Sequence, residues 1–126
     1  MTQALILIAD DEPNIVVSLE YLMRREGHRV SIARDGDEAL AAILRERPAL
    51  VLLDAMMPKR SGFEVCQEVR ANDELKHTLI LMLTAKGRDT DVAKGLGSGA
   101  DAYMTKPFST AELARKVRAM LGQGAA

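Results

Sequence analysis

The chain has 126 residues, of which 48% are hydrophobic and 28% are charged, a composition ordinary for one soluble globular domain. Seventeen basic residues against eighteen acidic ones leave a formal charge of −1, so we expect no direct binding of nucleic acid. The only cysteine, Cys66, excludes an intrachain disulfide and a cysteine zinc cluster, and we expect it to fill the core.

The first part of the chain pairs a buried strand with a helix. The apolar run Leu5–Ala9 stops at Asp10 and Asp11, as is typical of a strand buried on both faces of a parallel sheet. Apolar residues then recur at helical spacing from Pro13 until Gly27. The apolar run is far shorter than the ~20 residues that cross a membrane, and no basic run precedes it, so we expect a cytoplasmic protein without membrane contact.

The next segment repeats this alternation. Residues 28–33 are partly alternating, which predicts a strand at the edge of the sheet. The pair Asp35 and Gly36 then turns the chain into a second helix. The run 50–53 is wholly apolar and closes on Asp54, so we predict this aspartate at the tip of a third, buried strand.

The second half of the chain continues in the same way. The predicted elements are a helix over 63–69, a strand over 79–83, a helix over 90–96, a strand over 102–105 and a helix over 110–121. The two strands stop at Thr84 and Lys106. Because the helix over 90–96 is weakly apolar and has glycines around it, we expect it to be the loosest element.

Five strands that alternate with five helices predict an α/β fold with a doubly wound parallel sheet, because right-handed crossovers place helices on both faces. The pattern indicates one domain over residues 1–121, followed by a short tail over 122–126. No internal repeat or low-complexity tract interrupts it.

Polar side chains follow four of the predicted strands. In an open α/β sheet the ligand crevice lies beyond the carboxyl ends of the strands, where Asp10, Asp11, Asp54, Thr84 and Lys106 are expected to meet. Three clustered carboxylates repel one another unless a hard cation binds or protons are taken up, so we predict a Mg²⁺ site. Asp54 is then the candidate nucleophile for phosphoryl transfer, with Lys106 and Thr84 stabilising charge on the phosphoryl oxygens.

Four motifs together resemble the receiver domains of response regulators over nearly the whole chain. They are Asp10-Asp11, Leu52-Leu53-Asp54-Ala55-Met56-Met57-Pro58, Thr84-Ala85 and Lys106-Pro107-Phe108. The resemblance implies a flavodoxin-like fold with strand order 2-1-3-4-5. It also implies a phosphorelay receiver that accepts a phosphoryl group onto Asp54 with Mg²⁺ and then switches partner binding.

The resemblance assigns a role to each metal-site residue. Asp11 and Asp54 would bind Mg²⁺ directly, Asp10 would assist mostly through water, and Met56 would lend its backbone carbonyl. Neither Met56 nor Lys86 supplies a group that positions water, so we hypothesise slow autodephosphorylation.

Further roles concern the phosphoryl group and the switch. Lys106 would contact the phosphoryl group, Thr84 would move to hydrogen-bond it, and Tyr103 would turn inward on activation. The peptide bond before Pro107 would be cis, which costs little before proline.

The resemblance also implies partners. A histidine kinase or phosphotransfer protein would donate the phosphoryl group, and a downstream protein would bind the surface formed by residues 90–96, 102–105 and 110–121. A phosphorylation-dependent dimer is left open. Such a domain is a signalling switch, not an enzyme with a separate substrate, because it catalyses only its own phosphorylation and dephosphorylation.

Other interpretations compete with this one. The closest is a receiver excised from a longer DNA-binding response regulator or hybrid histidine kinase, although Met1 and the short tail favour a free-standing form. A flavin-binding domain needs phosphate donors where Asp10 to Glu12 stand, and a phosphatase with an aspartyl nucleophile needs an aspartate at position 12. Both histidines, His28 and His77, have polar neighbours, and we expect them to be solvated.

Overall fold

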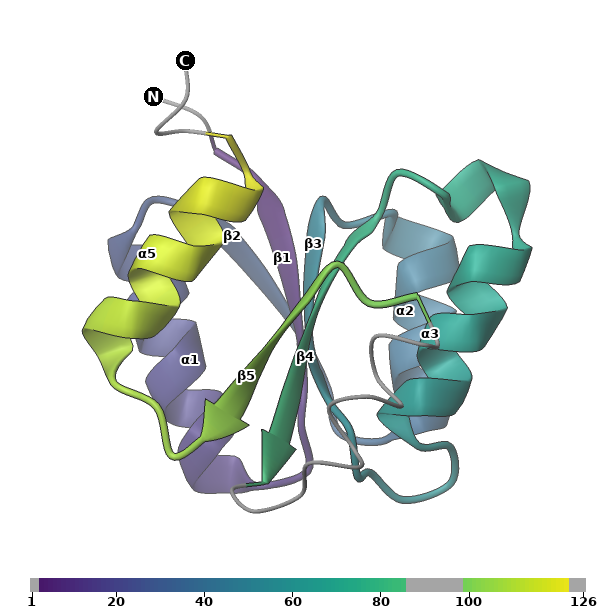
Figure 1. Cartoon of the computed structure of the whole chain (residues 1–126), viewed down its shortest axis with the longest axis horizontal. Coiled ribbons are helices and arrows are strands. Elements are labelled where there is room, and N and C mark those ends of the chain that lie inside the picture. The colour runs from purple at the N-terminus through teal and green to yellow at the C-terminus, as the bar shows by residue number, and fades with distance from the viewer. Residues whose placement is uncertain (1–2, 86–98, 123–126) are drawn as a thin grey trace.

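The computed structural model describes residues 3–85 and 99–122, which fold around one parallel sheet with helices on both faces (Figure 1). The strands are β1 (Leu5–Ala9), β2 (Arg29–Ala33), β3 (Leu50–Asp54), β4 (Leu79–Ala85) and β5 (Ala102–Lys106). The helices are α1 (Pro13–Arg25), α2 (Gly36–Glu46), α3 (Gly62–Ala71), α5 (Thr110–Met120) and the short 3₁₀ helix η1 (Asp73–Leu75). The strand order β2-β1-β3-β4-β5 is the flavodoxin-like order that the resemblance implied.

Two apolar layers hold the sheet in place. Side chains alternate along β3, so Leu50 and Leu52 pack toward α1 and α5, whereas Val51 and Leu53 pack toward α2 and α3. All four side chains are fully buried, which explains why the sequence of this strand is an unbroken apolar run. The same holds for the other inner strands, β1 and β4, so the carboxyl ends of these three strands form a fixed edge of the domain.

The predicted elements are confirmed within the described residues, with small differences at their ends. The fourth strand continues through Thr84 to Ala85. Between the third helix and this strand the short helix η1 also forms, and the Asn72 side chain caps it by accepting a hydrogen bond from the Glu74 N–H. The predicted helix over 90–96 lies outside the described residues, as does most of the predicted tail. None of the described helices is long and apolar enough to span a bilayer.

One prediction about a side chain is wrong. His28 is not solvated but buried, with 4% of its surface exposed, whereas His77 is exposed as expected. The Nδ1 atom of His28 accepts a hydrogen bond from the backbone N–H of Ala4 at 3.2 Å. Burial lowers the pKa of His28, which favours the neutral ring that this hydrogen bond requires.

Candidate metal and nucleophile site

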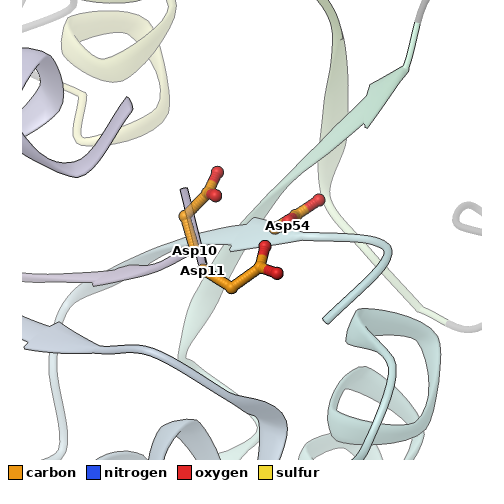
Figure 2. Close-up of side chains that lie close together, drawn as sticks. All are labelled: Asp10, Asp11 and Asp54. Carbon is orange, nitrogen blue, oxygen red and sulfur yellow. The ribbon is translucent and has the colours of Figure 1, made fainter. Parts of the chain in front are cut away.

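Three carboxylates converge at the carboxyl edge of the sheet (Figure 2). Ala9 pairs with Leu53 in the parallel register of β1 and β3, so Asp10 and Asp11 follow β1 beside the end of β3, where Asp54 stands. One oxygen from each carboxylate can be chosen so that all three lie within 4.8 Å of one another. Asp10 and Asp54 are buried and Asp11 is exposed, so solvent reaches the cluster from the Asp11 side.

The ammonium group of Lys106 enters this cluster from β5. Its Nζ donates a hydrogen bond to Asp10 Oδ2 at 2.8 Å and lies 3.6 Å from Asp54 Oδ1. The other Asp10 oxygen, Oδ1, accepts the backbone N–H of Glu12 at 2.9 Å. Asp10 is thus fixed at both oxygens, and Lys106 is its direct charge partner.

The pKa of Asp54 shows that the cluster is short of positive charge. Burial raises the pKa of Asp54, and the charge of Asp10 raises it further, to about 7, although Lys106 and the Met56 N–H act in the opposite direction. For Lys106, burial lowers the pKa, but the hydrogen bond to Asp10 and the charge of Asp54 raise it more, so its net pKa is raised. Lys106 therefore stays charged while the Asp54 carboxylate is only partly ionised near neutral pH.

The donor set fits a hard divalent cation. All three side chains offer carboxylate oxygens, which are the ligands that Mg²⁺ prefers, and the exposed Asp11 leaves room for water. Added positive charge would also relieve the repulsion that raises the pKa of Asp54. The described acidic cluster can therefore bind a metal ion.

A short loop after β3 shapes the surroundings of Asp54. The backbone N–H of Met56 donates to Asp54 Oδ1 at 3.2 Å, and the N–H of Gly62 donates to the Ala55 carbonyl at 2.9 Å. The Met56 side chain in this loop is exposed, with 52% of its surface accessible to solvent. The loop therefore orients the Asp54 carboxylate while it leaves an apolar side chain at the solvent boundary.

Thr84 and Tyr103, the two residues predicted to act in the switch, differ in how far they are buried. Thr84 near the end of β4 is buried, and its hydroxyl has no hydrogen-bond partner within residues 3–85 and 99–122. Tyr103 on β5 is 40% exposed and is paired in register with Met82, two positions before Thr84.

The cis peptide bond between Lys106 and Pro107 is confirmed, and Lys86 lies outside the described residues.

Two glycines, Gly36 and Gly62, allow close backbone approaches at the loop after β3. A Cβ atom on Gly62 would lie 2.3 Å from the Asp54 carbonyl oxygen, and one on Gly36 would lie 2.0 Å from the Arg60 carbonyl oxygen. The Asp35-Gly36 pair was interpreted only as a turn. Its adjacency to the loop depends on how α2 packs, which no local sequence signal reveals.

Comparisons with known proteins agree with the fold. The family described as the response regulator receiver domain matches residues 6–118. A candidate response regulator from Chloroflexus aurantiacus is 34% identical, with a TM-score of 0.92 and coverage of 96% of this chain and 99% of its own.

Two further structures show the range of the likeness. The receiver domain of sensor histidine kinase PA1611 from Pseudomonas aeruginosa is 30% identical, with a TM-score of 0.88 and coverage of 96% of this chain and 99% of its own. That structure has a magnesium ion coordinated in its active site cleft. The chemotaxis response regulator CheY4 of Vibrio cholerae is 32% identical, with a TM-score of 0.88 and coverage of 94% of this chain and 99% of its own.

Proposed function

Because the chain belongs to the response regulator receiver domain family, we propose that Asp54 is the residue that accepts the phosphoryl group. The observation that carries this proposal is the position of Lys106, which lies between Asp10 and Asp54 at the edge where three carboxylates meet. A nucleophilic carboxylate beside a fixed ammonium group and a metal-binding cluster suits phosphoryl transfer, because positive charge stabilises the transferred group.

The donor is a phosphohistidine on a histidine kinase or phosphotransfer protein. An ionised Asp54 oxygen forms a bond to phosphorus while the phosphorus–nitrogen bond breaks. The electron pair of the broken bond stays on the imidazole nitrogen, and the imidazole takes up a proton. Lys106, whose pKa is raised, holds positive charge beside the transferred group. The product is an acyl phosphate on Asp54, and the donor regains its neutral histidine.

The metal ion that fits the cluster is Mg²⁺. Asp11 and Asp54 would hold it directly, Asp10 would assist through water, and the Met56 backbone carbonyl would complete the protein ligands. When bound, Mg²⁺ supplies positive charge to the phosphoryl oxygens and favours the ionised form of Asp54. Asp10 keeps its hydrogen bond to Lys106 in this arrangement, which suits its indirect role.

The switch begins at Thr84. Its buried hydroxyl has no partner among the described residues, so it is available to donate to a phosphoryl oxygen on Asp54. Movement of Thr84 displaces the end of β4 and makes space for the half-exposed Tyr103 ring to turn inward. The phosphorylated state thereby differs in the surface around β5 and α5.

A downstream protein binds that surface. A groove of about 980 Å³ runs between β5 and α5, and its lining includes Tyr103, Lys106, Arg115 and Lys116. Arg115 and Lys116 suit acidic groups of a partner, Glu112 in the same lining suits a basic group, and Tyr103 links the groove to the switch. The same face is where a phosphorylation-dependent dimer would form.

The domain works in the cytoplasm as residues 1–121, either alone or as part of a longer regulator or hybrid kinase. Its similarity both to a chemotaxis regulator and to the receiver of a sensor kinase supports each arrangement. In both arrangements the domain catalyses its own phosphorylation and dephosphorylation and acts on no separate substrate.

The test is treatment with acetyl phosphate or beryllofluoride, with and without Mg²⁺, followed by intact mass and NMR. The wild type is expected to gain one phosphoryl group only when Mg²⁺ is present, and Asp54→Ala is expected to gain none. Asp73→Asn, which changes an exposed carboxylate far from the cluster in sequence, is the matched control and should behave as the wild type. Modification of Asp54→Ala, or none in the wild type, would overturn the assignment.

A further inference from the structure

The first residue of α2 lies against the loop that follows Asp54. The N–H of Gly36 donates to the Pro58 carbonyl at 3.2 Å. A Cβ atom on Gly36 would lie 2.0 Å from the Arg60 carbonyl oxygen and 2.5 Å from the Arg60 Cβ. Only glycine permits this approach, so the start of α2 and the loop are fitted backbone to backbone.

Charged side chains hold the same loop on two sides. Asp35 caps α2 by accepting the Glu38 N–H at 2.8 Å, and its other oxygen lies 3.6 Å from Lys59 Nζ. Arg60 forms ion pairs with Asp37 on α2, at 2.9 Å, and with Glu68 on α3. The loop is therefore tied to both helices that cover this face of the sheet.

Lys59 indicates that the loop conformation is imposed. Its φ of 71° lies in the left-handed region, which a residue with a side chain adopts at an energetic cost. The cost is offset by contacts with the start of α2, among them the hydrogen bond from the Gly36 N–H to the Pro58 carbonyl at 3.2 Å and the ion pair of Lys59 with Asp35 at 3.6 Å. The path of the loop is thus set by its contacts with α2 and not by the preference of its own residues.

The other end of this loop is the metal site. Only Ala55 to Met57 separate Asp54 from Pro58, and the Met56 N–H donates to Asp54 Oδ1 at 3.2 Å. The N–H of Gly62 closes the loop on the Ala55 carbonyl. A displacement at Pro58 to Arg60 therefore moves Met56 relative to the cluster, because so short a closed loop has few backbone torsions that could absorb it.

We infer that the Asp35-Gly36 turn is a positioning element for the metal site, and that Gly36 fixes the Asp54–Met56 segment in the geometry that binds Mg²⁺. This inference rests on the proposed function, since it concerns the same metal ion. Gly36 touches neither metal nor phosphoryl group in this role and acts through the Pro58 carbonyl and the Arg60 backbone. Residues that orient metal ligands from outside commonly change metal affinity by about 10–100-fold.

The decisive variant is Gly36→Ala, measured by isothermal titration of Mg²⁺ and by amide NMR shifts of residues 54–56. Alanine is the better helix former, so propensity alone favours the variant, and a loss must come from contact with Arg60. We expect Mg²⁺ affinity to fall about tenfold or more. The amide shifts should move before any metal is added.

Two controls separate positioning from general stability. Ile43→Val removes a buried methylene from the same helix, seven residues after Gly36, and it should lower stability while Mg²⁺ affinity stays within about twofold of the wild type. Asp35→Asn keeps a good helix cap but removes the charge that faces Lys59. We expect Asp35→Asn to lower Mg²⁺ affinity by about two- to threefold. Lys59→Gln should lower it by the same amount, and the double variant should lose no more than either single variant.

The outcomes are distinct. Wild-type affinity in Gly36→Ala, or an equal loss in Ile43→Val, overturns the positioning role and leaves the proposed function intact. If Gly36→Ala does not fold, Asp35→Asn and Lys59→Gln test the positioning role instead. An unchanged Mg²⁺ affinity in both of these variants overturns that role. Absence of Mg²⁺ binding in the wild type itself overturns both the inference and the proposed metal.

Discussion

Lys106 donates its hydrogen bond to Asp10, at 2.8 Å, and lies farther from the proposed acceptor Asp54, at 3.6 Å. The ammonium group therefore neutralises the fully buried carboxylate and leaves Asp54 with less compensation. Burial and the charge of Asp10 raise the pKa of Asp54 to about 7, and this division of charge explains why the lysine beside it does not prevent the rise.

Replacement of Lys106 by methionine should damage both stability and chemistry. The change keeps the apolar stem but leaves the buried Asp10 carboxylate without its charge partner, so we expect the unfolding free energy in EDTA to fall by roughly 1–3 kcal/mol. Phosphorylation by acetyl phosphate should slow at least about tenfold, because the charge beside the phosphoryl oxygens is lost. Urea unfolding and intact-mass kinetics measure the two effects, and Lys116→Met on the exposed face of α5 is the control.

The raised pKa of Asp54 predicts an unusual pH dependence in the metal-free protein. Between the ordinary value of 3.8 and about 7, the folded state binds a proton that the unfolded state has released. The contribution of Asp54 to the unfolding free energy is therefore present at low pH and lost as pH rises through this window. The loss should reach roughly 2–4 kcal/mol, since one pKa unit is worth ~1.4 kcal/mol.

Urea unfolding in EDTA at several pH values checks this prediction. In Asp54→Asn the fall of the unfolding free energy between pH 4 and 7 should disappear, and the variant should be more stable than the wild type above pH 7. Mg²⁺ should stabilise the wild type and so reduce this difference in stability between the two proteins. A parallel pH profile in wild type and variant would show that Asp54 titrates normally.

The sequence was sufficient for the sheet and for the convergence of the site residues. Buried parallel strands such as β3 are apolar throughout, and the carboxyl ends of parallel strands must meet at one edge, so Asp10, Asp54 and Lys106 follow from topology. The distribution of charge among them does not follow, because it depends on differences of less than an ångström between Lys106 and its two partners.

Two other features depend on tertiary packing and were missed. The polar neighbours of His28 suggested solvent, but its ring is buried where the backbone of Ala4 supplies a hydrogen-bond donor from 24 positions away. Gly36 was interpreted as part of a turn, because its contact with Arg60 joins two segments that are distant in sequence. Local pattern carries no information about either contact.

The buried hydroxyl of Thr84 predicts opposite effects on stability and on switching. Thr84→Val replaces a hydroxyl that has no partner among the described residues with a methyl group of similar size, so the unfolding free energy should stay equal or rise by about 1 kcal/mol. The variant should still accept a phosphoryl group, but its NMR shifts at Tyr103 and along β5 should respond much less to beryllofluoride. Thr84→Ser, which keeps the hydroxyl, should retain the wild-type response, and a full response in Thr84→Val would remove Thr84 from the switch.

The exposed side chain of Met56 predicts a long-lived phosphoryl group. Met56 is 52% exposed at the rim of the site, and its apolar thioether neither positions nor activates water near Asp54. Met56→Asn supplies an amide that can orient water, so we expect the half-life of the aspartyl phosphate to shorten by about tenfold. Phosphate release after removal of acetyl phosphate measures it. Met56→Leu keeps the apolar bulk and should keep the wild-type lifetime, whereas an equal shortening in both variants would mean that another group controls hydrolysis.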